Sequence, residues 1–277
     1  MGEDFSYAAR PMIDTHAHVI ATDERRYPRA PLGGKQSDWS RERPVSAEQM
    51  LAAMDAAGIE KTVLVQASTC YGHDNSYLAD AITAHPQRFI GVFSVDVLAA
   101  NAEQRIHHWV ERGLAGLRVF VAGHTTSQDV RLDDPRSFAA WDCAAAAGLT
   151  ICVQVRAPAL GQLQSMLERF PKARVLLDHM ARPAADDAEP LFALAKYENL
   201  GLKLTTHNVR ELPQSFFARV VKSYGAARVA WGSNYPAAEG TLGALLADAR
   251  TALAACSAAE RDWIFSRTAR SFYAALA

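Results

Sequence analysis

The sequence predicts an α/β fold, a (β/α)8 TIM barrel that forms a single domain over residues 1–277, with a long loop after the first strand and a terminal helix. Three observations predict it: eight short apolar segments recur along the chain, a helix-compatible segment follows each, and 277 residues suit one such barrel. Segments such as TVLVQ and TICVQV are almost continuously apolar, as expected of strands that are covered on both faces. A doubly wound open sheet is the alternative, but it usually has fewer strands, and no GxGxxG turn follows the first strand here.

The predicted elements alternate along the chain. Strands are expected at 11–16, 61–66, 89–96, 114–120, 150–155, 174–179, 200–205 and 228–233. Helices are expected at 46–57, 77–85, 102–112, 137–147, 158–170, 189–197, 213–224 and 241–255, with the terminal helix at 258–276. Ser46 can cap the first helix, and Gly58, Gly113 and Gly148 follow the ends of three of them. The loop at 21–45, which contains Trp39, is either a lid or pocket wall or an ordinary surface excursion.

The composition argues against several classes of partner. The net charge is −1 and no run of like charges stands out, so neither nucleic acid nor an anionic membrane is the expected partner. No apolar stretch is long enough for a transmembrane helix, and the first ten residues lack a hydrophobic signal core. The four cysteines are scattered, which is typical of reduced thiols in a cytoplasmic protein. The oligomeric state does not follow from the sequence.

The motif IDTHAH, residues 13–18, is the strongest functional signal. Side chains two residues apart in a strand share a face, so His16 and His18 point the same way at the end of the first strand. In a barrel that end lies at the mouth, where active sites are built. Asp14 has the same parity one layer deeper and could orient an imidazole. A lone histidine is more often structural, but two at this spacing and place favour function.

Three further motifs accompany the His16–His18 pair. They are VLVQAS at 63–68 followed by Asp74-Asn75, DHMARP at 178–183, and WGSNYP at 231–236. Together the four resemble the amidohydrolase superfamily, in the branch that contains 2-pyrone-4,6-dicarboxylate lactonase and sugar-lactone hydrolases. The motifs span most of the chain, from Asp14 to Pro236. The resemblance implies a hydrolase that opens a small lactone or ester, one that carries a carboxylate, and a branch that is metal-independent.

The resemblance also implies roles for individual residues. His16, His18 and His179 would polarise the substrate carbonyl at the mouth, and Arg118 and Arg182 would bind a substrate carboxylate through their planar guanidiniums. Either arginine could instead form an internal ion pair, and Asp74-Asn75 could simply cap a helix. The expected catalytic set is His16, His18, His179 and Asn234. The expected substrate contacts are Ser68, Arg118, Gln154, Arg182 and Tyr235, with Gln66 a further candidate. For Ser68 and Gln66 a structural role is equally expected.

Asn234 breaks the family pattern, because the superfamily normally has an aspartate there as the base that activates water. An amide has no basic site near neutral pH. Three explanations remain open: a histidine is the base, the chain is an engineered Asp-to-Asn variant, or it is a natural binder without chemistry. The candidate histidines are His16, His18 and His179, with His207 and His124 behind them. Hydrolase ancestry with residual or altered activity is favoured, since the rest of the mouth is retained.

A metal is not expected to be required, although zinc is possible. His16, His18 and His179 could supply three ligands, as a catalytic zinc site needs. Arg118 would repel a dication, and Gln154 stands where metal-bearing relatives place a ligand. The alternatives are therefore a zinc-dependent amidohydrolase or decarboxylase on the same barrel, and a catalytically silent barrel that binds a small organic acid. In each case the expected partner is a small organic acid or lactone.

Overall fold

The computed structural model describes residues 11–121 and 130–276, and within them eight parallel strands form one sheet in the order β1 to β8. The strands are β1 Met12–Ala17, β2 Ile59–Val65, β3 Phe89–Ser94, β4 Gly116–Phe120, β5 Thr150–Gln154, β6 Arg174–Leu177, β7 Leu200–Thr205 and β8 Val229–Gly232. Just beyond β8, the Asn234 amide donates to the His16 carbonyl at 2.7 Å, and the His18 amide donates to the Tyr235 carbonyl at 2.8 Å. The first and last strands therefore meet, and the predicted (β/α)8 barrel is confirmed.

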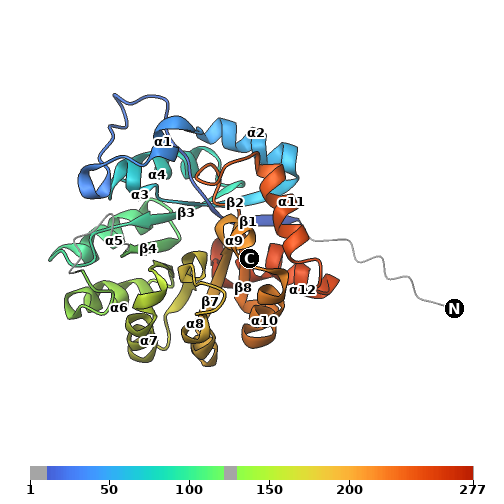
Figure 1. Cartoon of the computed structure of the whole chain (residues 1–277). Coiled ribbons are helices and arrows are strands. Elements are labelled where there is room, and N and C mark those ends of the chain that lie inside the picture. Colours follow the sequence, from blue (N-terminus) through green and yellow to red (C-terminus); the bar gives the residue numbers. More distant parts are fainter. Residues whose placement is uncertain (1–10, 122–129, 277) are drawn as a thin grey trace.

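Helices surround the strands on the outside (Figure 1). They are α1 Asp38–Glu42, α2 Ala47–Ala57, α3 Ser68–Tyr71, α4 Ser76–Ala84, α5 Ala102–Glu111, α6 Phe138–Ala146, α7 Leu160–Arg169, α8 Glu189–Ala193, α9 Thr206–Glu211, α10 Gln214–Tyr224, α11 Leu242–Ala252, α12 Ala258–Asp262 and α13 Thr268–Phe272. Ser46 caps α2 through a reciprocal bond with Gln49, and Gly58 ends it in the left-handed conformation, as the sequence indicates. In the described residues, no helix is both long and apolar enough to cross a membrane.

The structure differs from the predicted elements mainly at the mouth and at the C-terminus. Strand β6 ends at Leu177, two residues early, because a left-handed turn begins at His179. Two short helices that the sequence did not predict, α3 and α9, follow β2 and β7 directly. The predicted terminal helix is broken: a π-helical turn at Trp263–Arg267 separates α12 from α13.

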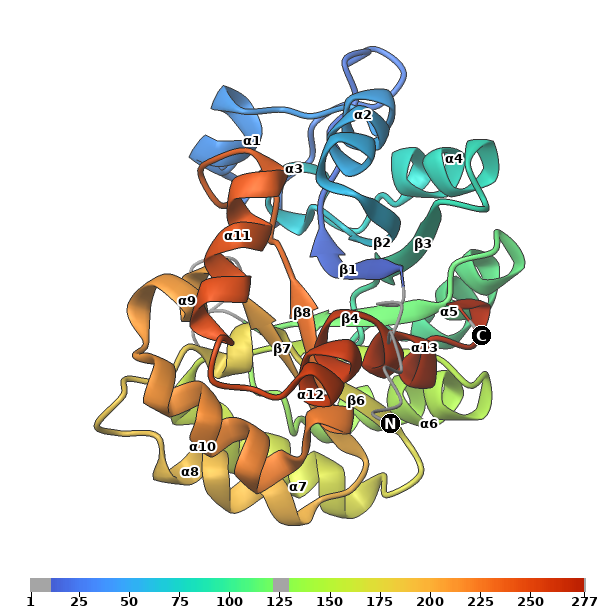
Figure 2. The ribbon, with the colours of Figure 1, turned by 90° about the vertical axis from the view of Figure 1, so that its right-hand side faces the viewer.

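An apolar plug closes the end of the barrel opposite the mouth. Tyr273, Phe272 and Leu276 pack with Ile13, Val65 and other inward-facing strand residues in one buried cluster. Figure 2 shows α13 lying close to the barrel strands. The Thr150 hydroxyl on β5 donates to the Phe272 carbonyl at 2.6 Å, which fixes the position of the plug. Water and ligands can therefore enter the barrel only from its other end.

Strands β1 and β8 approach each other closely at the mouth. A Cβ atom on Gly232 would lie 2.6 Å from Cβ of His16, so only glycine fits in that part of the WGSNYP motif. Asp14 bridges the same two strands: its carboxylate accepts from the backbone amides of His16 at 3.0 Å and Ser233 at 2.8 Å. The Ser233 hydroxyl adds a third bond at 2.5 Å. Asp14 therefore joins backbone segments and does not orient an imidazole, contrary to the prediction.

Candidate active site

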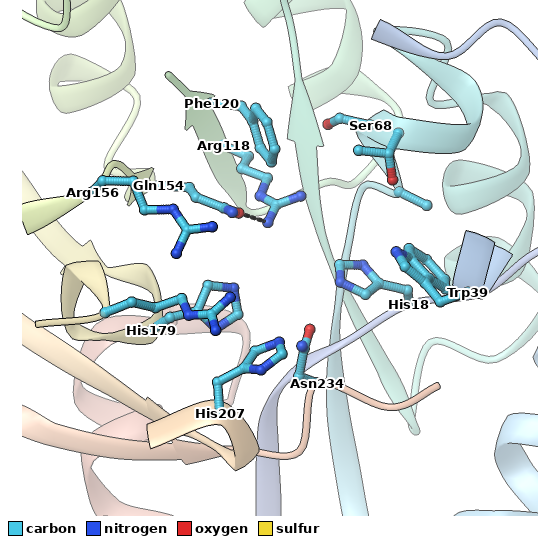
Figure 3. A pocket seen from close by; sticks show the side chains of 13 residues that line it. His18, Trp39, Ser68, Arg118, Phe120, Gln154, Arg156, His179, His207 and Asn234 are labelled. Atoms are coloured by element: carbon cyan, nitrogen blue, oxygen red, sulfur yellow. Dashed lines mark hydrogen bonds between the residues drawn. The ribbon is translucent and has the colours of Figure 1, made fainter. Parts of the chain in front are cut away.

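A cavity of about 100 Å³, partly open to solvent, lies at the carboxyl ends of the strands. A concave site at this place in a barrel is where a small molecule would bind. Its lining combines imidazoles, guanidiniums, amides and aromatic rings (Figure 3): His18, His179, His207, Arg118, Arg156, Arg182, Gln154, Asn234, Trp39 and Phe120. The small residues Ala67, Ser68 and Thr69 complete it. Of the thirteen lining residues, all within the described part of the chain, none is Asp or Glu.

His18 is held by one short hydrogen bond that defines its tautomer. Its Nδ1 lies 2.7 Å from the Val65 carbonyl oxygen at the end of β2. A carbonyl can only accept, so Nδ1 carries the proton and Nε2 keeps a free lone pair in the neutral ring. The Trp39 ring stacks on the imidazole, with 5.2 Å between centroids and 29° between planes. The loop after β1 thus supplies a wall of the cavity.

His179 lies in an unusual backbone turn. Four consecutive residues, His179 to Arg182, have φ between 50° and 59°. Each left-handed residue other than glycine costs roughly 1–2 kcal/mol, and strain of this kind tends to collect at functional sites. No glycine marks the segment, so this left-handed turn could not be predicted from the sequence. The turn lifts His179 and Arg182 to the cavity wall.

A chain of hydrogen bonds determines the tautomer of His179 as well. The Asn208 amide nitrogen donates to the His179 carbonyl at 2.8 Å, which sets the orientation of that amide. The Asn208 oxygen then accepts from the Thr205 hydroxyl at 3.2 Å. The Thr205 oxygen is left to accept from Nδ1 of His179 at 2.8 Å. Neutral His179 therefore also presents an unprotonated Nε2.

His16 lies beneath these two rings and does not line the cavity. It is fully buried, and its ring centroid is 5.1 Å from that of His18 and 4.7 Å from that of His179. Its Nδ1 is 3.5 Å from a carboxylate oxygen of Asp178. The sequence predicted that His16 contacts the substrate, but of the three imidazoles only those of His18 and His179 line the cavity.

A buried ion network occupies the centre of the barrel under the imidazoles. Asp178 has no solvent exposure and lies 3.1 Å from the Lys203 ammonium and 3.4 Å from Nε of Arg118. These cations, together with hydrogen bonding from His16, hold the pKa of the Asp178 carboxyl well below its usual range in spite of its burial. Two cations therefore face the Asp178 carboxylate. Lys203 was not predicted as a site residue, because its signal was one lysine inside the apolar strand GLKLT.

The imidazole rings of His16, His18 and His179 are neutral near pH 7. Burial is the main cause: it lowers the pKa of His16 to about 4, and it lowers the pKa values of His18 and His179 well below their usual range. Arg118 adds to the effect for each ring. His18 and His179 use their Nδ1 protons in hydrogen bonds with the protein. Each ring can therefore accept a proton at Nε2 but cannot donate one to a substrate carbonyl. This differs from the polarising role that the resemblance implied.

Arg118 serves both the internal network and the cavity. Besides Asp178, it donates to the Gln66 carbonyl at 3.0 Å and to the side-chain oxygen of Gln154. Its guanidinium also reaches the cavity wall, over the Phe120 ring. Gln66 itself is structural: its side chain donates to the carbonyls of Gly72 and Asp74, and it does not line the cavity.

Two arginines stand at the rim, and only one of them is paired. Arg182 forms an ion pair with Glu211 at 2.6 Å. Arg156, in the segment after β5, is exposed, and its guanidinium forms no hydrogen bond or ion pair with any residue in the described part of the chain. Burial of its inner part and the nearby Arg182 lower the pKa of the Arg156 guanidinium. Arg156 belongs to no motif and was not among the predicted site residues.

Other predicted site residues have different surroundings. The Ser68 hydroxyl is buried at the cavity wall without a hydrogen-bond partner in the described structure. Tyr235 is not among the lining residues; its side chain packs against the main hydrophobic core. Asn75 does not cap α4, because its side chain bonds the backbone of Ser94 at the end of β3. His124 lies outside the described residues.

Asn234 takes the place expected at the end of β8. Its φ of 58° is a left-handed value that asparagine tolerates better than most residues. The neighbouring Tyr235 is bridged to Ala17 in parallel, so Asn234 and His18 lie on the opposite, inward-facing side of the two segments. Both line the cavity, where Figure 3 draws the Asn234 side chain near the rings of His207 and His18.

The donor set does not fit a resident divalent metal. In residues 11–121 and 130–276, no group of three or more His, Cys, Asp or Glu side chains is arranged to hold one, and this includes the predicted set His16, His18 and His179. The nearest carboxylate, Asp178, is already engaged by Lys203 and Arg118, whose positive charges would repel a dication.

Comparison with known proteins gives relatives over nearly the whole chain. A sequence model described as Amidohydrolase matches residues 13–275. L-fucono-1,5-lactonase of Burkholderia ambifaria is 27% identical over 240 residues, which cover 81% of this chain and 80% of that protein. An amidohydrolase from Burkholderia multivorans with bound zinc superposes with a TM-score of 0.75 at 20% identity, covering 95% of this chain and 99% of that one. A protein named "probable 2-pyrone-4,6-dicarboxylic acid hydrolase" from Acinetobacter baumannii, with citric acid bound, gives 0.75 at 17% identity with the same coverage. At these identities the two structures support the fold alone.

Proposed function

The chain belongs to the amidohydrolase family, and from this premise we propose that it hydrolyses a small lactone that carries a carboxylate, without a metal. The family confirms the resemblance that the four motifs predicted, and with it a hydrolase. The lactone bond, the acid group and the metal independence are the proposal. The relative from B. ambifaria, which is named as a sugar lactonase, supports the first of these.

The observation that carries the proposal is the charge of the cavity. Arg118, Arg156 and Arg182 line the cavity, and no lining residue is acidic. The Arg156 guanidinium stands unpaired at the rim. Such a site favours an anion, both in the bound substrate and as charge develops on the reacting oxygen.

The geometry suggests how a lactone would lie. Its carboxylate would bind at the rim to Arg156, because Arg182 is already paired with Glu211. Its carbonyl oxygen would point inward to Arg118 and to the unpartnered Ser68 hydroxyl, which are the donors available there. Water would then attack the carbonyl carbon, the bond from that carbon to the ring oxygen would break, and a hydroxy acid would result. Arg118 would stabilise the oxyanion.

A panel of five- and six-membered lactones tests the proposal. Each opening releases a proton, which a pH indicator reports. We expect carboxylated lactones to be opened, and their neutral counterparts to react with a much higher KM. Arg118→Gln should lower kcat by roughly 10²–10³-fold, as the loss of an oxyanion donor does elsewhere. Equal rates on neutral and carboxylated lactones would contradict the assigned acid group.

A second function is favoured by one observation, the amide at position 234. A barrel that binds an organic acid without chemistry would keep the cationic cavity and lose the carboxylate base. In that case carboxylated lactones would raise the Tm of the protein without being opened. Hydrolysis that appears only in Asn234→Asp would then identify the chain as a binder.

A further inference from the structure

The lining of the cavity offers no carboxylate that could act as a base. Hydrolysis requires a group that takes a proton from water, yet no lining residue is a carboxylate. The two carboxylates nearest the cavity are both engaged, Asp178 with Lys203 and Arg118, and Glu211 with Arg182. The base must therefore be an imidazole.

We propose that Nε2 of His18 is the general base and that the Asn234 amide holds the attacking water beside it. This inference rests on the proposed lactone hydrolysis. It assigns to the first strand the proton transfer that the family places on the eighth.

The choice of His18 follows from a comparison of the histidines. His16 is fully buried below the cavity and does not line it. His179 depends for its tautomer on a hydroxyl, which can donate or accept, and on a second bond of 3.2 Å. His18 has a carbonyl partner at 2.7 Å, which leaves only one protonation pattern for the neutral ring. His207, on α9 beside His179, also lines the cavity, but no side-chain hydrogen bond within the described residues fixes its tautomer.

The surroundings of His18 suit the imidazolium that proton transfer would create. The ring would hold protons on both nitrogens, and the bond from Nδ1 to the Val65 carbonyl would become charge-assisted and stronger. The face of Trp39, 5.2 Å away, would stabilise the cation further. These are contributions that grow during the reaction, as catalysis requires.

The atoms balance over the full reaction. Water gives its oxygen to the acyl carbon and one proton to Nε2 of His18. When the acyl–oxygen bond breaks, the imidazolium returns that proton to the departing ring oxygen, which becomes a hydroxyl. His18 ends neutral, and no further reactant is needed.

Burial lowers the pKa of His18 well below its usual range, so the ring is neutral near pH 7 and its Nε2 is free to accept a proton. The Asn234 amide is uncharged and can form a hydrogen bond with water. It would not hold the proton on His18 as an aspartate would, so the imidazolium could pass that proton on.

A double-mutant experiment tests the assignment. His18→Gln should lower kcat on a carboxylated lactone by roughly 10²–10⁴-fold, with little change in KM. Adding Asn234→Asp supplies a carboxylate beside the water, and should restore at least part of the lost rate. His108→Gln, on the exposed face of α5, is the matched control and should behave as wild type. Wild-type kcat in His18→Gln would overturn the proposal, and so would equal rates for the single and double variants.

A second measurement does not depend on activity. Nitrogen-15 NMR of the imidazoles at neutral pH should show Nδ1 of His18 protonated and Nε2 unprotonated, with the assignment made by loss of those signals in His18→Gln. Protonation at Nε2 would overturn the proposal. If wild type opens no lactone, the proposed function fails, while the nitrogen signals still decide whether His18 is poised as a base.

Discussion

Acidification should destabilise this protein through His16, and the structure sets the size of the effect. Burial lowers the pKa of folded His16 to about 4, whereas an unfolded histidine titrates near 6.5. Between these values the unfolded chain binds the proton and the folded one does not. The stabilisation is therefore complete above pH 6.5 and is lost as the pH falls toward 4. From pH 7 to pH 5, linkage gives a loss of about 2 kcal/mol in the free energy of unfolding from this residue alone.

The difference between wild type and His16→Asn isolates that contribution. The variant loses packing at every pH, so its stability is lower throughout, but it should lose about 2 kcal/mol less than wild type between pH 7 and pH 5. A comparison of proteins is needed because other groups titrate too. His18 and His179 act in the same direction, while burial raises the pKa of Asp14 to about 6, which acts in the opposite one.

Urea unfolding followed by tryptophan fluorescence at several pH values measures the effect. Between pH 7 and pH 8, where His16 is neutral in both states, the stabilities of the two proteins should change in parallel. They should converge as the pH falls below 6.5. Parallel stability curves down to pH 5 would refute the reasoning, because they would mean that folded His16 binds a proton as readily as an unfolded histidine.

Three other outcomes are expected. Arg156→Gln should raise KM for a carboxylated lactone roughly 10- to 100-fold with little change in kcat, since a charged hydrogen bond contributes about 1.5–3 kcal/mol; Arg136→Gln, on the exposed surface, is the control, and an equal KM in steady-state kinetics would contradict the role. Lys203→Met should lower the free energy of unfolding by about 3–5 kcal/mol by removing one partner of a buried ion pair. Adding Asp178→Asn should recover part of that loss in urea unfolding, and no recovery would show that the pair is not coupled. Dialysis against a chelator should leave the rate of lactone opening unchanged, since Lys203 would repel a dication, and a rate restored only by zinc would contradict this.

The barrel architecture could be predicted from the sequence because each signal for a strand or helix was local. Buried parallel strands are almost continuously apolar, and the His16–His18 spacing gave the face and the end of β1 without knowledge of its neighbours. What failed depended on contacts between distant segments. Asp14 shares the parity of the two histidines, but its partners lie 219 residues away at Ser233, and only barrel closure brings them together.

Residues that bear the charge of the site were harder to find. Lys203 is a single lysine in a strand, and its importance lies in its ion pair with Asp178, which directly follows β6. Arg156 follows β5 in no recognisable pattern. Nothing in the residues after Asp178 signals the left-handed turn that carries His179, because non-glycine residues adopt it only when the surrounding structure compensates for the strain.

The most direct test is a crystal structure of His18→Gln, a variant designed to bind substrate without opening it, soaked with a carboxylated lactone. We predict an intact ring at the mouth of the barrel, with its carboxylate on Arg156 and its carbonyl oxygen toward Arg118 and Ser68. A water molecule should lie between Asn234 and residue 18, in line with the carbonyl carbon. A lactone bound outside this cavity, or one with its acid group away from the arginines, would contradict the central claim.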